Sequence, residues 1–277
     1  MSLPKIPLAG VLGSPIAHSK SPQLHRHWLT TYGIQGHYIP MDIAPQDLES
    51  VIRMLPRMGF VGVNVTIPHK EAVLSMADLV TDRAILIGAA NTLIFRKDGK
   101  IHADNTDGYG FIENLKTGAP NWAPKTGPAA VLGAGGAARA VVASLLDAGV
   151  PEILVSNRTR VRAEKLKADF GSRLRIFDWV QAGNMLDQAA LVVNTTSLGM
   201  IGKGEMRVPL DGLRKESVVT DLVYTPLKTK LLEAAEDCGC VTVDGLGMLL
   251  HQAVPAFERW FGKRPEVDRA TRAAALR

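Results

Sequence analysis

The stretch Val131-Leu132-Gly133-Ala134-Gly135-Gly136-Ala137-Ala138-Arg139 lies near the middle of this chain of 277 residues and decides its fold. Residues 128–132 are short and apolar and predict a strand, and residues 137–148 favour a helix that stops at Gly149. A strand, a glycine turn and a helix start together bind the pyrophosphate in a Rossmann fold. A purely structural turn is the alternative. We expect five residues to approach the pyrophosphate: Gly133, Ala134, Gly135, Gly136 and Ala137.

The end of the next predicted strand, Ile153-Leu154-Val155-Ser156, indicates which dinucleotide binds. Roughly 20 residues after the glycine turn, an NAD enzyme carries Asp or Glu for the ribose 2′-hydroxyl. This chain has Asn157 there, followed by Arg158, Arg160 and Arg162. A carboxylate would repel a 2′-phosphate, whereas an amide and guanidinium groups bind one. The sequence therefore predicts NADP as cofactor, with a solvated first helical turn as the alternative explanation of the arginines.

Composition and charge fit a soluble enzyme with anionic ligands. Hydrophobic residues make up 46% and charged residues 21% of the chain, and no apolar run approaches the roughly 20 residues that span a bilayer. Residues 1–5 open no apolar signal segment, so we expect a cytoplasmic protein without a membrane partner. The net charge is +5, but the basic residues are dispersed and no nucleic-acid motif accompanies them. We therefore expect no nucleic-acid partner.

The cysteines and histidines do not predict a metal site. Cys238-Gly239-Cys240 cannot complete a zinc site alone, and its spacing is poor for a disulfide, so we expect reduced, structural thiols. His18, His25 and His27 raise a metal hypothesis. His25 and His27 would lie far apart around a helix, however, and no carboxylate cluster joins them.

The chain is long enough for two domains, and alternating strands and helices predict an α/β fold for both. We expect an N-terminal α/β substrate domain at residues 1–107 plus 244–277 and a Rossmann-type NADP-binding domain at residues 108–243, with the C-terminal helix returning to the first. The predicted elements of the first domain are strands at residues 6–13, 37–41 and 59–67, helices at 21–32, 45–55 and 248–261, a hairpin of residues 87–95 and 100–102, and a short helix within the tail 268–277. Ser21-Pro22 resembles a helix N-cap followed by proline.

Four stretches of the first half combine polar residues with turn formers: His18-Ser19-Lys20-Ser21-Pro22, Asn64-Val65-Thr66-Ile67-Pro68-His69-Lys70, Ala89-Ala90-Asn91-Thr92 and Asn105-Thr106-Asp107-Gly108-Tyr109-Gly110. Asn64 and Thr66 occupy alternate positions near a strand end, so their side chains share a face. Ligands of α/β sheets bind beyond the carboxyl ends of strands. The stretches offer hydroxyls, amides, one amine and one carboxylate, which are groups that hold a small polyol acid.

These stretches, in this order before the glycine turn and Asn157-Arg158-Thr159, closely resemble the shikimate dehydrogenase family. Three later stretches carry the same resemblance: Asn194-Thr195-Thr196-Ser197-Leu198-Gly199-Met200, Asp221-Leu222-Val223-Tyr224 and Asp244-Gly245-Leu246-Gly247-Met248-Leu249-Leu250-His251-Gln252-Ala253. The resemblance extends from Gly13 to about Ala253. It implies the NADP-dependent interconversion of 3-dehydroshikimate and shikimate, a step toward chorismate and the aromatic amino acids.

The resemblance also implies residue roles. It implies Lys70 and Asp107 at the reacting hydroxyl, although by itself Lys70 fits a surface lysine and Asp107 a helix N-cap. The implied substrate-binding residues are Ser19 and Ser21 for the carboxylate, Asn64, Thr66, Asn91 and Gln252 for the ring hydroxyls and carboxylate, and Tyr224 nearby. The implied cofactor-binding residues beyond the glycine turn are Asn157, Arg158, Thr159 and Arg162 at the ribose phosphate, and Thr195, Leu222 and Gly245 toward the nicotinamide. Helix capping is the alternative role of both serines, and a core or surface aromatic that of Tyr224.

Two other functions stay open on the sequence. A quinate/shikimate dehydrogenase of broader substrate use shares the fold, but members that use NAD tend to carry an acid where this chain has Asn157. A non-catalytic NADPH-binding regulator is the second alternative, although such a protein has no need of the Lys70 and Asp107 pair. Either way the expected partner is a small molecule, and the chain is expected to be a monomer or a homodimer.

Overall fold

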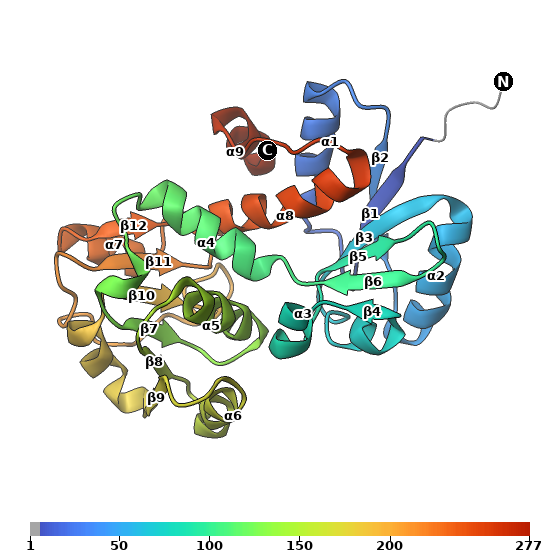
Figure 1. The fold of residues 1–277 in the computed structure, drawn as a ribbon. Helices are drawn as coiled ribbons and strands as arrows, with labels where there is room; N and C mark the ends of the chain where they lie inside the picture. The colour runs from blue at the N-terminus through green and yellow to red at the C-terminus, as the bar shows by residue number, and fades with distance from the viewer. Residues whose placement is uncertain (1–5) are drawn as a thin grey trace. The chain divides into compact units, whose positions relative to one another are not determined.

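The computed structural model describes residues 6–277, which form two compact units (Figure 1). The first unit comprises Met1–Thr106 and Gln252–Arg277, and the second comprises Asp107–His251. The prediction about residues 1–5, that they open no signal segment, falls outside the described residues. Across residues 6–277, no helix combines the length and the apolar character that crossing a membrane requires.

The first unit contains one mixed six-stranded sheet in the order β2-β1-β3-β5-β6-β4. Its elements before the second unit are β1 (Leu8–Gly13), α1 (Ser21–Thr31), β2 (His37–Asp42), η1 (Pro45–Asp47), α2 (Leu48–Met54), η2 (Leu55–Met58), β3 (Phe60–Val65), η3 (Ala72–Met76), β4 (Leu79–Val80), α3 (Asp82–Ile87), β5 (Thr92–Phe95) and β6 (Ile101–Asp104). The chain re-enters this unit within α8 (Leu246–Phe261) and ends with α9 (Arg269–Leu276). Strands β1, β2 and β3 are parallel, whereas β5 is antiparallel to β3 and β6.

Two local predictions in the first unit are wrong. The predicted strand at residues 87–95 begins only at Thr92, because Ile87 ends helix α3. The Thr81 hydroxyl caps α3 by accepting from the Ala84 N–H, and Gly88 closes it with a φ of +75°. The second error concerns α1: the residue before the helix is Lys20, and Ser21 is already its first residue. The Ser19 hydroxyl, not that of Ser21, accepts a backbone N–H there, from Ser21 at 3.3 Å.

The second unit is a fully parallel six-stranded sheet in the order β12-β11-β10-β7-β8-β9. Its elements are α4 (Asp107–Gly118), η4 (Pro124–Thr126), β7 (Ala129–Leu132), α5 (Gly136–Ala148), β8 (Ile153–Ser156), α6 (Arg160–Phe170), β9 (Leu174–Phe177), η5 (Trp179–Gln188), β10 (Leu191–Asn194), β11 (Val218–Asp221), α7 (Lys230–Asp237) and β12 (Val241–Val243). Numbered from β7, this is the strand order 3-2-1-4-5-6 of a Rossmann fold. The prediction of that fold is confirmed.

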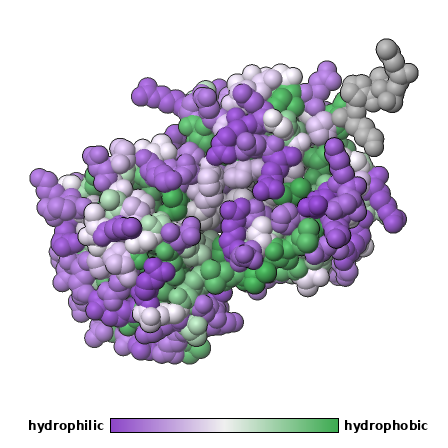
Figure 2. Space-filling model, in the orientation of Figure 1, coloured by the Kyte–Doolittle hydropathy of each residue, from purple (hydrophilic) through white to green (hydrophobic). Residues whose placement is uncertain are grey.

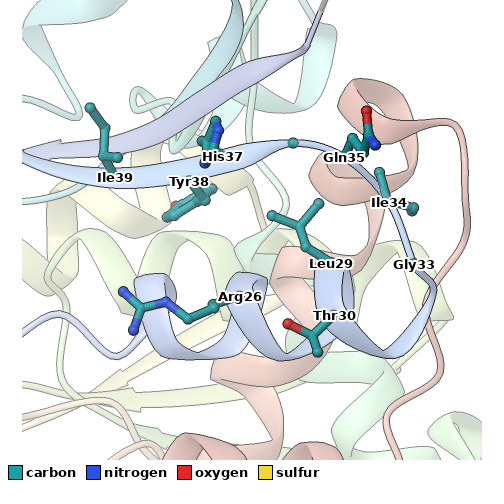
Figure 3. Close-up of a pocket in the computed structure, with 10 residues that line it drawn as sticks. Arg26, Leu29, Thr30, Gly33, Ile34, Gln35, His37, Tyr38 and Ile39 are labelled. Carbon is teal, nitrogen blue, oxygen red and sulfur yellow. The ribbon is translucent and has the colours of Figure 1, made fainter.

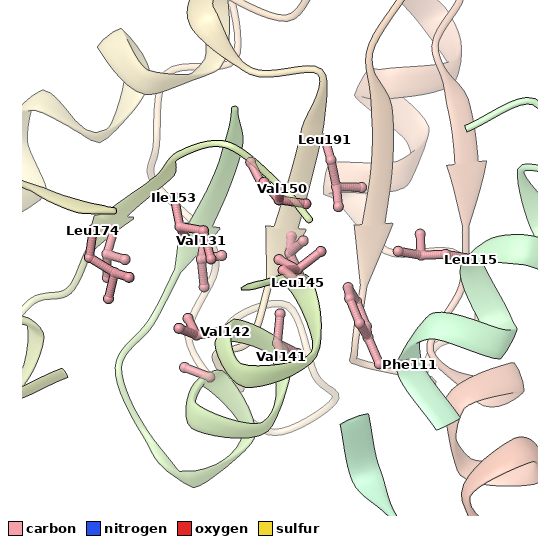
Figure 4. Packing of buried hydrophobic residues seen from close by; sticks show 14 of the residues in the cluster. Phe111, Leu115, Val131, Val141, Val142, Leu145, Val150, Ile153, Leu174 and Leu191 are labelled. Atoms are coloured by element: carbon pink, nitrogen blue, oxygen red, sulfur yellow. The ribbon is translucent and has the colours of Figure 1, made fainter. Parts of the chain in front are cut away.

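Alternate residues of the second sheet enter two separate cores. Val131, Ile153 and Leu191 pack with helices α4, α5 and α6 on one face, as Figure 4 shows. Their neighbours along the strands, such as Leu154 and Val192, pack with η5 and α7 on the other face. Strands buried on both faces need continuous apolar runs, which explains why this half of the sequence predicts its fold so directly.

Hydrophilic residues cover most of the face shown in Figure 2, and hydrophobic surface gathers over α3. Helix α3 carries two exposed large hydrophobic side chains, Ile85 and Leu86. Cys238 is exposed and Cys240 buried, and both thiols are free. Among residues 6–277, no three His, Cys, Asp or Glu side chains are grouped to hold a metal ion.

Candidate functional site

The glycine turn between β7 and α5 leaves open space at the start of the helix. Gly133 has a φ of +113°, and a Cβ at this position would collide with the Thr195 hydroxyl. A Cβ built on Gly135 or Gly136 would meet no atom within 4 Å, so both glycines border open space. The first N–H groups of α5 have no partner within the helix and can donate to a phosphate there. This geometry fits a bound pyrophosphate.

The residues after β8 suit a phosphorylated ribose. Asn157 donates from its amide to the Thr159 carbonyl at 2.8 Å, which fixes the loop that leads into α6. Arg158 and Arg162 are exposed, and neither forms an ion pair within residues 6–277. Arg160 differs, because it binds Glu164 at 2.8 Å and also Asp178. Of the three arginines that the sequence groups together, two remain available for an anion.

Three further predicted cofactor residues follow strand ends of the second unit. The Thr195 hydroxyl donates to the Leu132 carbonyl at 2.7 Å, which places it beside the glycine turn. A Cβ on Gly245 would collide with the Leu222 carbonyl, so only glycine permits this contact. Thr195 follows β10, Leu222 follows β11 and Gly245 comes after β12, at the carboxyl ends of the strands where Rossmann folds bind ligands.

The carboxylate of Asp221 connects these loops through hydrogen bonds. Its carboxylate accepts from the Asn194 amide at 2.8 Å, the Thr229 hydroxyl at 2.7 Å and the Val223 N–H at 3.0 Å. Burial raises the pKa of Asp221, although these three donors oppose the rise. Tyr224 follows in the same loop, where burial raises the pKa of its hydroxyl. Its place near a substrate stays a prediction.

In the first unit, Asn91 is the centre of a buried amide network. Its side chain donates to Gln252 at 3.1 Å and accepts from the Thr106 N–H at 2.9 Å. The Asn64 amide donates to the Asn91 carbonyl at 3.1 Å and to the Thr92 hydroxyl at 3.2 Å. Three predicted substrate-binding residues, separated in sequence by up to 188 positions (252 − 64), therefore lie in one network.

Three other predicted site residues, Thr66, Lys70 and Asp107, lie close in sequence to residues of this network or to residues that bond to it. Thr66 follows β3, and a Cβ on Gly13 would lie 2.6 Å from its methyl group, so glycine permits the two strands to end together. The backbone carbonyl of Lys70 accepts from the Ala90 N–H at 2.8 Å, which holds Lys70 next to the Asn91 segment. Asp107 is the first residue of α4 and directly follows Thr106, which bonds to Asn91.

Asp104 supports the segment that leads to Asp107. It is buried, and its carboxylate accepts from the Arg83 guanidinium at 2.6 and 2.5 Å and from the Thr81 hydroxyl at 2.9 Å. Burial by itself would raise the pKa of Asp104, but the Arg83 pair and these donors hold it below its ordinary value.

We expect Arg83→Met to lower the free energy of unfolding at pH 7 by about 2 kcal/mol, since it removes a charged hydrogen-bond partner from a buried carboxylate. A carboxyl whose folded pKa is lowered stabilises the protein above its unfolded pKa, and this contribution disappears as the pH falls through the folded value. Urea unfolding should therefore show the difference between variant and parent narrowing below about pH 4. Arg96→Met, in the exposed pair with Asp98, is the matched control and should change little. If the difference in the free energy of unfolding between variant and parent did not change with pH, Arg83 would act through packing and not through its charge.

A separate surface hollow of about 460 Å³ lies between α1, the following turn and β2 (Figure 3). None of the predicted site residues lines it. Its lining residues are Arg26, Leu29, Thr30, Gly33, Ile34, Gln35, Gly36, His37, Tyr38 and Ile39. Of these, Tyr38 reaches the amide network, because its hydroxyl donates to the Asn64 Oδ1 at 2.8 Å. No feature of the sequence indicates this contact, since a tyrosine in a strand ordinarily predicts only a core position.

Comparisons with known proteins agree with this geometry. Three family models match the chain: "Shikimate dehydrogenase substrate binding domain" at residues 11–93, "Shikimate / quinate 5-dehydrogenase" at residues 121–244 and "Shikimate 5'-dehydrogenase C-terminal domain" at residues 245–275. A shikimate dehydrogenase (NADP(+)) of Roseobacter denitrificans is 70% identical over 276 residues, covering 100% of both chains. One from Cereibacter sphaeroides is also 70% identical, covering 98% of each.

Two solved structures are similar along the chain. The quinate dehydrogenase of Corynebacterium glutamicum in complex with NAD is 32% identical with a TM-score of 0.91, covering 98% of this chain and 99% of that one. The shikimate 5-dehydrogenase of Thermus thermophilus in complex with NADP(H) and shikimate is 39% identical with a TM-score of 0.86, covering 98% of each.

Proposed function

This chain belongs to the shikimate dehydrogenase family, and from that premise we infer that it catalyses the reversible, NADP-dependent reduction of 3-dehydroshikimate to shikimate. It is an oxidoreductase that acts on a CH–OH group. The observation that carries the substrate assignment is the 70% identity to an NADP-dependent shikimate dehydrogenase over its full length. Asn157 and Arg158, which follow β8, support the same cofactor independently, because within residues 6–277 Arg158 forms no ion pair.

We propose that the glycine turn and the start of α6 hold the cofactor. Gly133, Ala134, Gly135, Gly136 and Ala137 would bind the pyrophosphate, and Asn157, Arg158, Thr159 and Arg162 the 2′-phosphate. Thr195, Leu222 and Gly245 would line the nicotinamide end. When bound, NADPH supplies the hydride for the reduction. The open space before Gly135 and Gly136 supports this assignment.

The protein must donate a proton to the reacting oxygen and stabilise the negative charge that develops on it. We propose that the Lys70 ammonium stabilises negative charge that develops on that oxygen and donates a proton to it. Asp107 would orient the amine and accept a hydrogen bond from the substrate hydroxyl. Two backbone hydrogen bonds near Asn91 support the pairing. The Lys70 carbonyl accepts from the N–H of Ala90, the residue before Asn91. Asp107 directly follows Thr106, whose N–H donates to the Asn91 side chain.

We propose that the hydroxyls and amides of the first unit recognise the substrate. Ser19 and Ser21 would bind its carboxylate, and Thr66, Asn64, Asn91 and Gln252 its remaining polar groups, with Tyr224 close by. Buried partners of this kind reject analogues that lack the matching hydroxyl by large factors, because the protein group is left unpaired.

The test is a comparison of kcat/KM for shikimate and for quinate, each with NADP and with NAD. We expect shikimate with NADP to give the highest value. Faster turnover of quinate with NAD would instead support a quinate dehydrogenase. The absence of any shikimate-dependent change in NADPH absorbance would support a non-catalytic, NADPH-binding regulator.

We further propose that the enzyme works in the cytoplasm as a monomer or homodimer, on a small-molecule substrate and without a nucleic-acid partner. The dispersed basic residues support the last point. Light scattering of the purified protein and a heparin-binding assay at moderate salt test these two statements separately.

A further inference from the structure

The hydroxyl of Tyr38 contacts a predicted substrate-binding side chain of a different strand. It donates to the Asn64 Oδ1 at 2.8 Å. Tyr38 lies in β2 and Asn64 in β3. Tyr38 itself is buried, with 6% of its surface exposed.

The proton on this hydroxyl determines the direction of the hydrogen bond. A tyrosine hydroxyl carries one proton, which goes to the Asn64 oxygen because an amide oxygen only accepts. Burial raises the pKa of Tyr38 well above its ordinary value, so the donor to Asn64 stays protonated throughout the working pH range.

The Tyr38 ring is itself held in place. It stacks on the His25 ring with a centroid distance of 3.8 Å and an interplanar angle of 8°, and Trp260 packs at 6.2 Å. Figure 3 shows the Tyr38 ring between β2 and α1, the helix that carries His25. Burial lowers the pKa of His25 to about 3, so the stacked ring is neutral and adds no charge beside the network.

The consequence for Asn64 is a fixed orientation. With its oxygen turned to Tyr38, its amide nitrogen faces the Asn91 carbonyl and the Thr92 hydroxyl. Loss of the tyrosine oxygen would leave the Asn64 oxygen without this donor, so the amide could turn. The Tyr38 hydroxyl therefore sets the orientation of a residue assigned to the polar groups of the substrate.

We propose that Tyr38 is a positioning residue of the substrate site, whose hydroxyl fixes the orientation of the Asn64 amide. This inference rests on the proposed function of Asn64. Tyr38 acts through that residue.

The test is Tyr38→Phe, which removes one oxygen and keeps the stacked ring. We expect KM for shikimate to rise roughly tenfold, as the loss of one net hydrogen bond implies, with kcat and the KM for NADP within twofold of the parent. Tyr32→Phe is the matched control. Tyr32 lies in the same unit, and within residues 6–277 the one hydrogen bond that the structure gives its hydroxyl is accepted from the Glu266 N–H at 3.0 Å. Loss of this hydroxyl should leave both KM values unchanged.

A double-mutant cycle makes the test independent of overall stability. In an Asn64→Ala background the effect of Tyr38→Phe on the shikimate KM should shrink, because the hydrogen-bond acceptor of the tyrosine hydroxyl is already absent. Three outcomes would overturn the proposal: a shikimate KM within twofold of the parent, a parallel rise in the KM for NADP with a larger drop in Tm than Tyr32→Phe causes, or full additivity in the cycle. The parent enzyme in the same assay tests the proposed function separately, since its turnover of shikimate does not depend on the role of Tyr38.

Discussion

Replacing Lys70 by alanine should lower kcat for shikimate oxidation by a factor on the order of 10³, the range in which a positioned proton-transfer group contributes. The variant loses both the charge that stabilises the developing alkoxide and the proton donor of the reverse reaction. KM for NADP should change little, because the residues assigned to the cofactor belong to the second unit and Lys70 to the first. Steady-state kinetics in both directions measure these values.

Lys97→Ala is the matched control for Lys70→Ala, because Lys97 is an exposed lysine in the turn between β5 and β6 of the same unit. Its kcat should equal that of the parent. Shikimate that carries deuterium at the oxidised carbon adds a second measurement, since a slower chemical step in the Lys70 variant should show a larger isotope effect. An unchanged kcat for Lys70→Ala would remove this residue from the chemistry.

Arg158→Ala should raise KM for NADP about 10- to 100-fold, which corresponds to the loss of a hydrogen-bonded charge partner of the 2′-phosphate. The low rate with NAD should stay nearly the same, since NAD has no phosphate at that position. Arg158→Lys should lie between the two, because lysine keeps the charge but loses the bidentate geometry. The measurement is KM and kcat with each cofactor at saturating shikimate.

Arg160→Ala is the informative control for Arg158→Ala. Arg160 is two residues away at the same helix start, but it is engaged by Glu164 and Asp178. We therefore expect only a small change in KM for NADP. Equal losses with NADP and NAD in Arg158→Ala would show that this arginine supports the fold and not the phosphate.

The predictions that succeeded are those that depend on local sequence. Two apolar strands that flank Gly133, Gly135 and Gly136, together with a helix former that ends at Gly149, specify a Rossmann unit over about 30 residues. Asn157 and its arginines come directly after the next strand and indicate the cofactor by their charge. The error at residues 87–95 has the same origin. The apolar run of residues 85–87 suits a strand as well as a helix. The N-terminal cap by Thr81 and the left-handed Gly88 favour the helix.

The sequence by itself determined the class of fold, the dinucleotide turn and the identity of most residues that could bind a polyol acid. Tertiary structure alone decided how those residues are connected. It paired Arg160 with Asp178 but gave Arg158 no ion pair within residues 6–277. It joined Asn64 and Asn91 to Gln252, and it placed the Tyr38 hydroxyl against the Asn64 oxygen. The physical reason is the separation in sequence over which each kind of interaction acts. Helix and strand periodicity, turns and caps act over a few residues, whereas a hydrogen bond between side chains dozens of positions apart depends on how complete elements pack.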